Sequence, residues 1–119
     1  SEKPITQESI ENLLRDIFQE QARKTITIDA IQRRVAEHFD VRLADMTSKR
    51  RQANIAFPRQ IAMFLSRQHT SSSLCDIGDA FGGKDHGTVI HACKLVKKRM
   101  EADEKTRQIV GMLDSKLQR

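Results

Sequence analysis

The amino-acid sequence predicts an all-α fold of about six helices, and three observations support this. Apolar residues recur every three or four positions in several segments, which is the period of one buried helix face. No segment alternates apolar and polar residues in the way that is typical of a half-buried strand. Trp and Tyr are absent and only 5 of the 119 residues are Phe, so the core must be mainly aliphatic. The length is that of one helical domain with a modest core.

The first two predicted helices each show one apolar stripe. Thr6 can act as the N-cap of the first helix. The stripe that we expect this helix to bury consists of Ile10, Leu13, Leu14, Ile17 and Phe18. Residues 24–27 interrupt the pattern, and a second helix follows. Its apolar side consists of Ile28, Ile31, Val35 and Phe39.

For the middle of the chain, the sequence predicts a brief helix, a loop and a long helix. The brief helix should lie near residues 44–47, and residues 48–53 are polar and cationic, as in a loop. The long helix should begin near Asn54, a good N-cap, with Pro58 close enough to its first turn that the missing N–H costs little. Its inward face consists of Ile55, Ile61, Ala62, Phe64 and Leu65, whereas Arg59 and Arg67 need not face inward.

The segment from residue 73 to residue 100 predicts two helices joined by a tight turn. Ser73 and Asp76 resemble a capping box that opens a helix over residues 74–81, and Gly82-Gly83 ends it. Asp85 can cap the next helix, which buries Val89, Cys93, Val96 and Met100. Asp103 can cap a last helix, which carries Ile109, Met112, Leu113 and Leu117. On spacing alone, this is the outline of a helix-turn-helix or of an ordinary helical hairpin.

The net charge of +5 is concentrated in the middle of the chain. Residues 46–75 contain five basic and no acidic side chains, whereas residues 1–45 carry a net charge of −2 and residues 76–119 a net charge of +2. Such a stretch can be a solvated face, but the lack of neutralising carboxylates favours a polyanionic partner, most simply nucleic acid.

The sequence indicates a soluble, cytoplasmic protein. Cys75 and Cys93 are too far apart for a C-x-x-C motif, so ordinary reduced thiols are expected. No apolar run approaches the length of a membrane span, and the first residues lack the pattern of a signal peptide.

Three motifs occur in an order that resembles one protein family. They are Lys49-Arg50-Arg51, the segment from Pro58 to Met63 (PRQIAM), and the segment from Ile77 to His86 (IGDAFGGKDH). Together they resemble the C-terminal DNA-binding domain of the bacterial DnaA family of chromosomal replication initiators. The resemblance covers residues 25–119 well and residues 1–24 more loosely. It implies a helix-turn-helix DNA-binding domain over 25–119, and in 1–24 the linker helix from the end of an AAA+ region.

The resemblance also implies which residues contact DNA. The helix that opens at Asp85 would enter the major groove, and Arg51, with Arg50 beside it, would enter the adjacent minor groove. Arg59 and Gln60 match positions on the DNA backbone, and Lys49 adds general attraction. The full predicted DNA-binding set is Lys49, Arg50, Arg51, Arg59, Gln60, Cys75, Lys84, Asp85, His86, Gly87, Thr88, His91 and Lys94.

The side chains at the start of this helix have suitable chemistry. Asp85 can accept from a cytosine or adenine amino group, His86 can donate to a base or a phosphate, and Thr88 offers a methyl and a hydroxyl. His91 and Lys94 lie further along and suit phosphates. Three positions depart from the family pattern: Gly87 replaces a Thr or Ser of many relatives, Cys75 a frequent Pro, and Lys84 a common Arg.

The expected function is non-enzymatic, sequence-specific binding of double-stranded DNA at the short asymmetric DnaA boxes of a bacterial replication origin. The domain should bind as a monomer and need no cofactor or metal. By resemblance, the full-length protein would bind ATP and Mg²⁺ in its AAA+ region and oligomerise at the origin. The linker helix could contact acidic phospholipids.

Three alternatives start from the same residues. A basic helical module could instead bind RNA or a protein partner. Gly78 to Lys84 fits most of a phosphate-binding P-loop, but Asp85 replaces the Mg²⁺-holding Ser or Thr and no buried strand precedes it. His86, His91 and Cys93 suggest a metal site, yet two His five residues apart do not share a helix face, so we expect none.

Overall fold

The computed structural model describes residues 7–24 and 26–118, and for residues 7, 8 and 18–24 it describes the backbone only. The elements in chain order are α1 (Gln7–Lys24), α2 (Ile28–Phe39), the 3₁₀ helix η1 (Leu43–Met46), α3 (Ala53–His69), α4 (Leu74–Ala80), α5 (His86–Ala102) and α6 (Glu104–Leu117). The described residues contain no strand. The predicted all-α class with about six helices is therefore confirmed.

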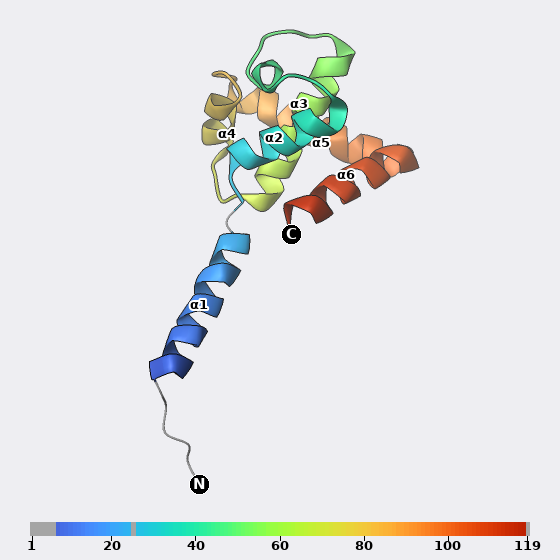
Figure 1. Ribbon diagram of the computed structural model, residues 1–119. Helices are drawn as coiled ribbons and strands as arrows, with labels where there is room; N and C mark the ends of the chain where they lie inside the picture. Colours follow the sequence, from blue (N-terminus) through green and yellow to red (C-terminus); the bar gives the residue numbers. More distant parts are fainter. Residues whose placement is uncertain (1–6, 25, 119) are drawn as a thin grey trace.

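Helix α3 lies at the centre of a bundle formed by α2 to α6 (Figure 1). It packs mainly against α5 and α2, while α4 and α6 pack against α5. Each of these elements, and η1, contributes fully buried side chains to one core: Ile31, Val35, Met46, Ile61, Leu65, Ile77, Phe81, Val89, Val96 and Leu113. The helical spacing in the sequence therefore identified most of the inward positions correctly.

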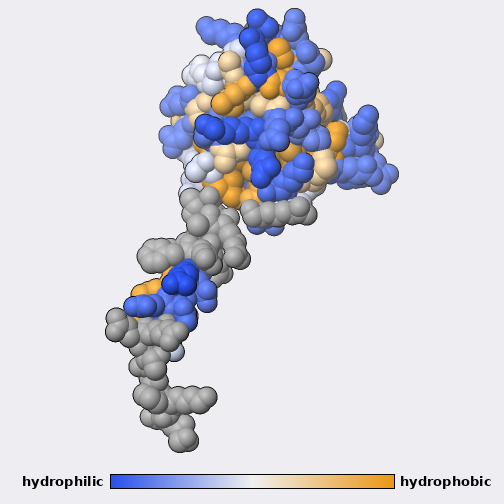
Figure 2. All heavy atoms as spheres, in the orientation of Figure 1, coloured by the Kyte–Doolittle hydropathy of each residue, from blue (hydrophilic) through white to orange (hydrophobic). Residues whose placement is uncertain are grey.

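Helix α1 extends away from the bundle (Figure 1). The expectation that its apolar stripe is buried is wrong for the described side chains: Ile10, Leu13, Leu14 and Ile17 are between 42% and 61% exposed. Figure 2 shows part of this apolar surface in orange at one edge of α1, below the bundle. Thr6 and the Phe18 side chain lie outside the described residues. None of the described helices combines the length and the apolar character needed to cross a membrane.

The start of α3 differs from the prediction. Gln52 occupies the N-cap position and makes no side-chain capping hydrogen bond, so Asn54 is not the cap. Pro58 is then the sixth residue of the helix, beyond the first four N–H groups that have no partner in any α-helix. Its missing N–H therefore removes a main-chain hydrogen bond, contrary to our expectation. The ring is fully buried, which offsets part of this cost.

Helix α6 closes the bundle. Asp103 caps it as predicted, because its carboxylate accepts from Lys105 N (3.2 Å) and Thr106 Oγ1 (2.8 Å). Of the apolar residues named for this helix, Leu113 and Leu117 are buried, whereas Met112 is 41% exposed; Val110 is buried as well. The side chains of His69 and Asp114 form a hydrogen-bonding contact that joins the end of α3 to α6.

Candidate nucleic-acid interface

Helices α4 and α5 form a helix-turn-helix with a very close turn. Ser73 Oγ caps α4 by accepting from Asp76 N at 3.1 Å, which confirms the N-cap and is one of the two hydrogen bonds of the predicted capping box. Gly82 and Gly83 follow α4 with φ of +91° and +75°, in the left-handed region that favours glycine. A Cβ added to Gly78 would lie 2.0 Å from the main-chain oxygen of Lys84. The turn therefore folds back on α4 so tightly that only glycine fits at this position.

The N-terminus of α5 is exposed and well capped. Asp85 Oδ1 accepts hydrogen bonds from Thr88 N (2.8 Å) and Thr88 Oγ1 (2.9 Å). These two bonds are the main cause of a lowered pKa for the Asp85 carboxyl, with smaller contributions in the same direction from His86 and the Gly87 N–H. The side chains of His86 and Thr88 are exposed, so a ligand can reach this end of the helix.

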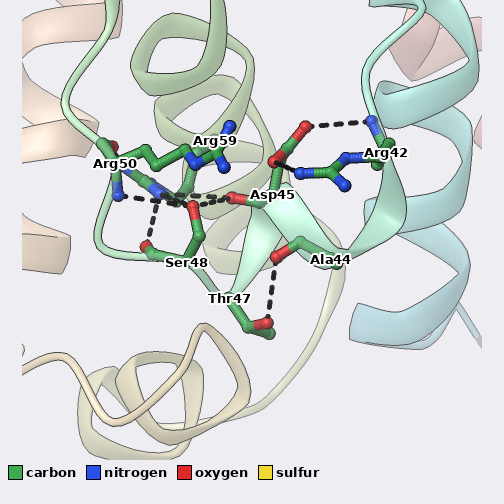
Figure 3. A network of polar contacts seen from close by, with 7 residues as sticks. All are labelled: Arg42, Ala44, Asp45, Thr47, Ser48, Arg50 and Arg59. Carbon is green, nitrogen blue, oxygen red and sulfur yellow. Dashed lines mark hydrogen bonds and ion pairs between the residues drawn. The ribbon is translucent and has the colours of Figure 1, made fainter.

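Residues 47–52, which we call the cationic loop, carry three exposed basic side chains: Lys49, Arg50 and Arg51. The loop is held from inside by Arg59 of α3 (Figure 3). Arg59 Nη1 donates to Ser48 O (2.6 Å), Asp45 O (3.2 Å) and Ser48 Oγ (3.3 Å), and Arg59 Nη2 donates to Arg50 O. A single guanidinium therefore donates to a main-chain oxygen of η1, that of Asp45, and to two main-chain oxygens of the loop, those of Ser48 and Arg50.

The position of Arg59 corrects the expectation that it need not face inward. Its side chain is only 7% exposed, because the fork of donors follows the loop carbonyls instead of pointing to solvent. Burial lowers the pKa of the Arg59 guanidinium, and the buried Asp45 carboxylate partly offsets this effect. Whether Arg59 also touches the DNA backbone stays a prediction.

Asp45 in turn is fixed by Arg42. The main-chain N–H of Arg42 donates to Asp45 Oδ2 at 3.1 Å, and its guanidinium lies 3.5 Å from Asp45 Oδ1. The two charged groups differ greatly in exposure, at 70% for Arg42 and 7% for Asp45. The buried carboxylate thus lies between an exposed and a buried guanidinium.

Lys84, in the turn before α5, also points inward. Its ammonium donates to Phe81 O (2.6 Å) and to Ser48 O (3.0 Å). Burial lowers the pKa of Lys84, and the positive charges of Arg59 and Lys49 lower it further. A Cβ on Gly82 would lie 2.2 Å from Thr47 O, so the turn and the cationic loop are in direct contact at a second point.

A groove separates the cationic loop from α5, with α3 at its base. Its lining residues are Lys49, Arg51, Ala56, Arg59, Gln60, Met63, Lys84, Thr88, His91 and Ala92. Seven of these belong to the predicted DNA-binding set, so residues up to 42 positions apart meet on one face of the bundle. The other predicted residues are exposed but do not line the groove: Arg50, Cys75, Asp85, His86, Gly87 and Lys94.

Sequence reasoning missed the residues that hold the loop. Asp45 and Ser48 were not singled out, although both accept hydrogen bonds from Arg59. The spacing of Arg42 and Asp45, three residues apart, is a weak signal that could have indicated their ion pair. The role of Ser48 has no such signal, because its main-chain oxygen is the principal acceptor.

The segment that resembled a P-loop does not have the required shape. Gly78 lies inside α4, and the Lys84 ammonium donates to protein carbonyls. A P-loop needs a strand-to-helix loop whose N–H groups surround a phosphate. As for metals, no three His, Cys, Asp or Glu side chains gather within the part of the chain that the structure describes.

A short helix, a glycine turn and a longer helix with an exposed N-terminus, beside a cationic loop, define a helix-turn-helix DNA-binding domain. Residues 28–96 match the family model described as "Bacterial dnaA protein helix-turn-helix". The chain belongs to this family. The match covers the helix-turn-helix and the part of the bundle that precedes it.

Relatives extend the similarity to nearly the whole chain. The chain is 46% identical over 116 residues to the "Chromosomal replication initiator protein DnaA" of Methylacidiphilum infernorum, covering 98% of this chain and 26% of that protein. It is 41% identical over 113 residues to the protein of the same name from Treponema denticola, covering 95% and 24%. The chain thus spans about a quarter of the length of these curated relatives.

A solved structure shows the same fold. The crystal structure of a DNA replication initiation factor superposes with a TM-score of 0.69 at 34% identity. The superposition covers 92% of this chain and 32% of the other.

Proposed function

We propose that this domain recognises DnaA boxes in double-stranded DNA at a bacterial replication origin, as part of a chromosomal replication initiator. The N-terminus of α5 would enter the major groove, where His86 and Thr88 reach base edges. Arg51 would enter the adjacent minor groove, whose narrow A·T-rich form concentrates negative potential. A monomer would suffice, because the two elements contact one asymmetric site.

The observation that carries this proposal is the shared groove between the cationic loop and α5. Lys49 and Arg51 lie on one side of it, and Thr88 and His91 lie on the other. A duplex presents its major and minor grooves on either side of one phosphate strand, and in the proposed complex the loop and α5 would each enter one of them. The charge distribution supports it too, since residues 46–75 have no acidic side chain.

The relatives support a role within a longer protein. Both are named chromosomal replication initiators, and most of their length lies outside the match. We propose that residues 1–24 link this domain to an AAA+ region that binds ATP and Mg²⁺ and oligomerises on origin DNA. The exposed apolar stripe of α1 would be covered by that region or by acidic phospholipids. Residues 25–119 would need no cofactor and perform no catalysis.

Competition binding tests the proposal. A labelled duplex with one DnaA box is bound by the domain, and unlabelled box or scrambled duplex of equal length and composition competes at constant salt. We expect the box to compete about a thousandfold better than the scrambled duplex. Equal competition by both duplexes would refute sequence recognition. Stronger competition by single-stranded RNA, or no binding of any nucleic acid, would favour the RNA or protein module.

Arg51→Ala tests the minor-groove assignment. Loss of the guanidinium should reduce the preference for A·T pairs at one end of the box by about 1–3 kcal/mol. The matched control is Arg67→Ala, which removes an exposed arginine of α3 that does not line the groove. An equal loss of affinity for all sequences would show that Arg51 contacts only the phosphate backbone.

A further inference from the structure

One main-chain oxygen joins three parts of the interface. Ser48 O, in the cationic loop, accepts from Arg59 Nη1 at 2.6 Å and from Lys84 Nζ at 3.0 Å. Arg59 comes from α3, and Lys84 comes from the turn that precedes α5. A carbonyl oxygen has two lone pairs, so both donors can be satisfied by this one acceptor.

The shared oxygen lies between the two elements that would read DNA. Ser48 is three residues before Arg51, and Lys84 is one residue before the N-cap of α5. The close approach of Gly82 to Thr47 O gives a second contact between the same two segments. The loop and the turn that leads into α5 are therefore joined by direct contacts in the protein without DNA, so the position of the loop relative to the start of α5 is set before binding.

We propose that Arg59 and Lys84 are positioning residues, which fix the distance between the minor-groove arginine and the N-terminus of α5. The inference rests on the proposed function and assigns different roles to the exposed and the internal cations. The exposed cations of the loop and of α5 hold the phosphates and bases. Arg59 and Lys84 instead determine whether both grooves can be engaged at once.

Most of the hydrogen-bond donors of these two side chains are already used within the protein. Arg59 is 7% exposed, and both of its terminal nitrogens donate to loop acceptors. Lys84 uses two of its three donors on main-chain oxygens. Each charged hydrogen bond of this kind contributes more than a neutral one, so removal of one cation loosens the loop.

The test compares Lys84→Met with Lys94→Met. Both changes remove one lysine charge near the interface. Within the described residues, Lys94 is exposed and has no hydrogen bond or ion pair, so Lys94→Met is the matched control. Three quantities are measured: hydrogen exchange of the loop amides without DNA, base discrimination at each end of the box, and the slope of log K against log salt.

For Lys84→Met we expect faster exchange of the Ser48 and Arg50 amides in the free protein, by about tenfold. Discrimination at the minor-groove end should fall about tenfold, while discrimination at the α5 end and the salt slope stay unchanged. Lys94→Met should give the opposite pattern. Its exchange rates and discrimination should match the parent protein, and its slope should fall by about 0.9 because one phosphate contact is lost.

The contrary result for Lys84→Met would be unchanged exchange, unchanged discrimination and a slope reduced by about 0.9. Lys84 would then be a phosphate ligand and the proposal would be wrong. Arg59→Lys supplies a second test, because it keeps the charge but not the planar fork. Reduced base discrimination by Arg59→Lys, in a protein that keeps a native circular dichroism spectrum, would support the positioning role. Full activity of Arg59→Lys would overturn it.

The exchange measurement separates this inference from the proposed function. It needs no DNA, so it reports the loop's anchorage even if the parent protein shows no preference for the box. Faster loop exchange together with equal binding of box and scrambled duplex would leave the anchorage established and refute sequence recognition. Unchanged exchange with strong box preference would refute the positioning role alone.

Discussion

Thr88 donates both its main-chain N–H and its hydroxyl to a single oxygen of Asp85, Oδ1, at 2.8 and 2.9 Å. The hydroxyl hydrogen of Thr88 is therefore used within the first turn of α5. What Thr88 offers to a base is its methyl group and the acceptor side of its oxygen. Asp85 serves as an N-cap in the free protein, so any base contact that it makes must share the carboxylate with this role.

The capping role of Asp85 predicts a specific dependence of stability on pH. Because the folded protein lowers the pKa of this carboxyl, ionised Asp85 stabilises the fold above its ordinary pKa of 3.8, and the contribution is lost as the pH falls through the lower folded value. Asn can form the same capping hydrogen bonds, but it does not titrate and lacks the negative charge that interacts favourably with a helix N-terminus. Asp85→Asn should therefore melt a few degrees below the parent protein at pH 6, and the gap should close below about pH 3.8.

Thermal unfolding followed by circular dichroism at several pH values measures this gap. Asp103→Asn provides an independent check, because hydrogen bonds from Thr106 and Lys105 also lower the pKa of the Asp103 carboxyl at the start of α6. Both variants should follow the same pH profile. A gap that widens on acidification would contradict the proposed charge–helix interaction.

We expect alanine substitutions at two glycines to have opposite effects on the free energy of unfolding. Gly78→Ala would place a Cβ 2.0 Å from Lys84 O, a main-chain atom, so α4 or the turn must shift. We expect a loss of about 1–3 kcal/mol in the free energy of unfolding. Gly111 lies in α6 with nothing near its Cβ position, so Gly111→Ala should gain about 0.5–1 kcal/mol. Urea denaturation of both variants measures the difference, and equal values would contradict the tight turn.

The resemblance implies a Thr or Ser at position 87 in many relatives, and the structure leaves room for a side chain there. A Cβ would lie 3.4 Å from Asp85 Oδ1, an ordinary contact. Gly87→Ala should stabilise the fold by at most about 1 kcal/mol without changing affinity for the box. Gly87→Thr should add a contact to DNA and raise the affinity severalfold. Denaturation and binding assays on both variants separate the two effects, and weaker binding by Gly87→Thr would mean that the DNA approaches too closely for a side chain.

The local parts of the fold could be predicted from the sequence. The start of α4, its cap at Ser73, the turn at Gly82-Gly83 and the cap at Asp85 depend on neighbouring residues, and all are confirmed, while α4 ends at Ala80, one residue before its predicted end. The core positions of α2 and α5 follow from apolar spacing in the same way. These features are set within a few residues, so one sequence contains enough information.

The tertiary parts could not be predicted. Arg59 is a charged residue in the middle of a helix, and its sequence neighbours do not indicate that it is buried. It is buried because the loop folds over it and its main-chain oxygens accept hydrogen bonds from the guanidinium. The inward direction of Lys84 depends on Ser48, 36 residues away. Likewise, the stripe of α1 shows which face of the helix is apolar but not what covers it. Composition predicted a cationic surface correctly, whereas the division into exposed and internal cations needed coordinates.

The two cysteines give a prediction that joins structure to DNA binding. Burial raises the pKa of the Cys93 thiol, although the charge of Arg67 offsets part of this, whereas Cys75 is exposed in the first turn of α4. The thiolate is the reactive form, so iodoacetamide at about pH 8 should modify Cys75 several times faster than Cys93. Mass spectrometry of Cys75→Ser and Cys93→Ser assigns each rate.

Because Cys75 belongs to the predicted DNA-binding set, box duplex should slow its modification and an equal amount of scrambled duplex should not. A rate for Cys75 that box duplex leaves unchanged would remove this residue from the interface.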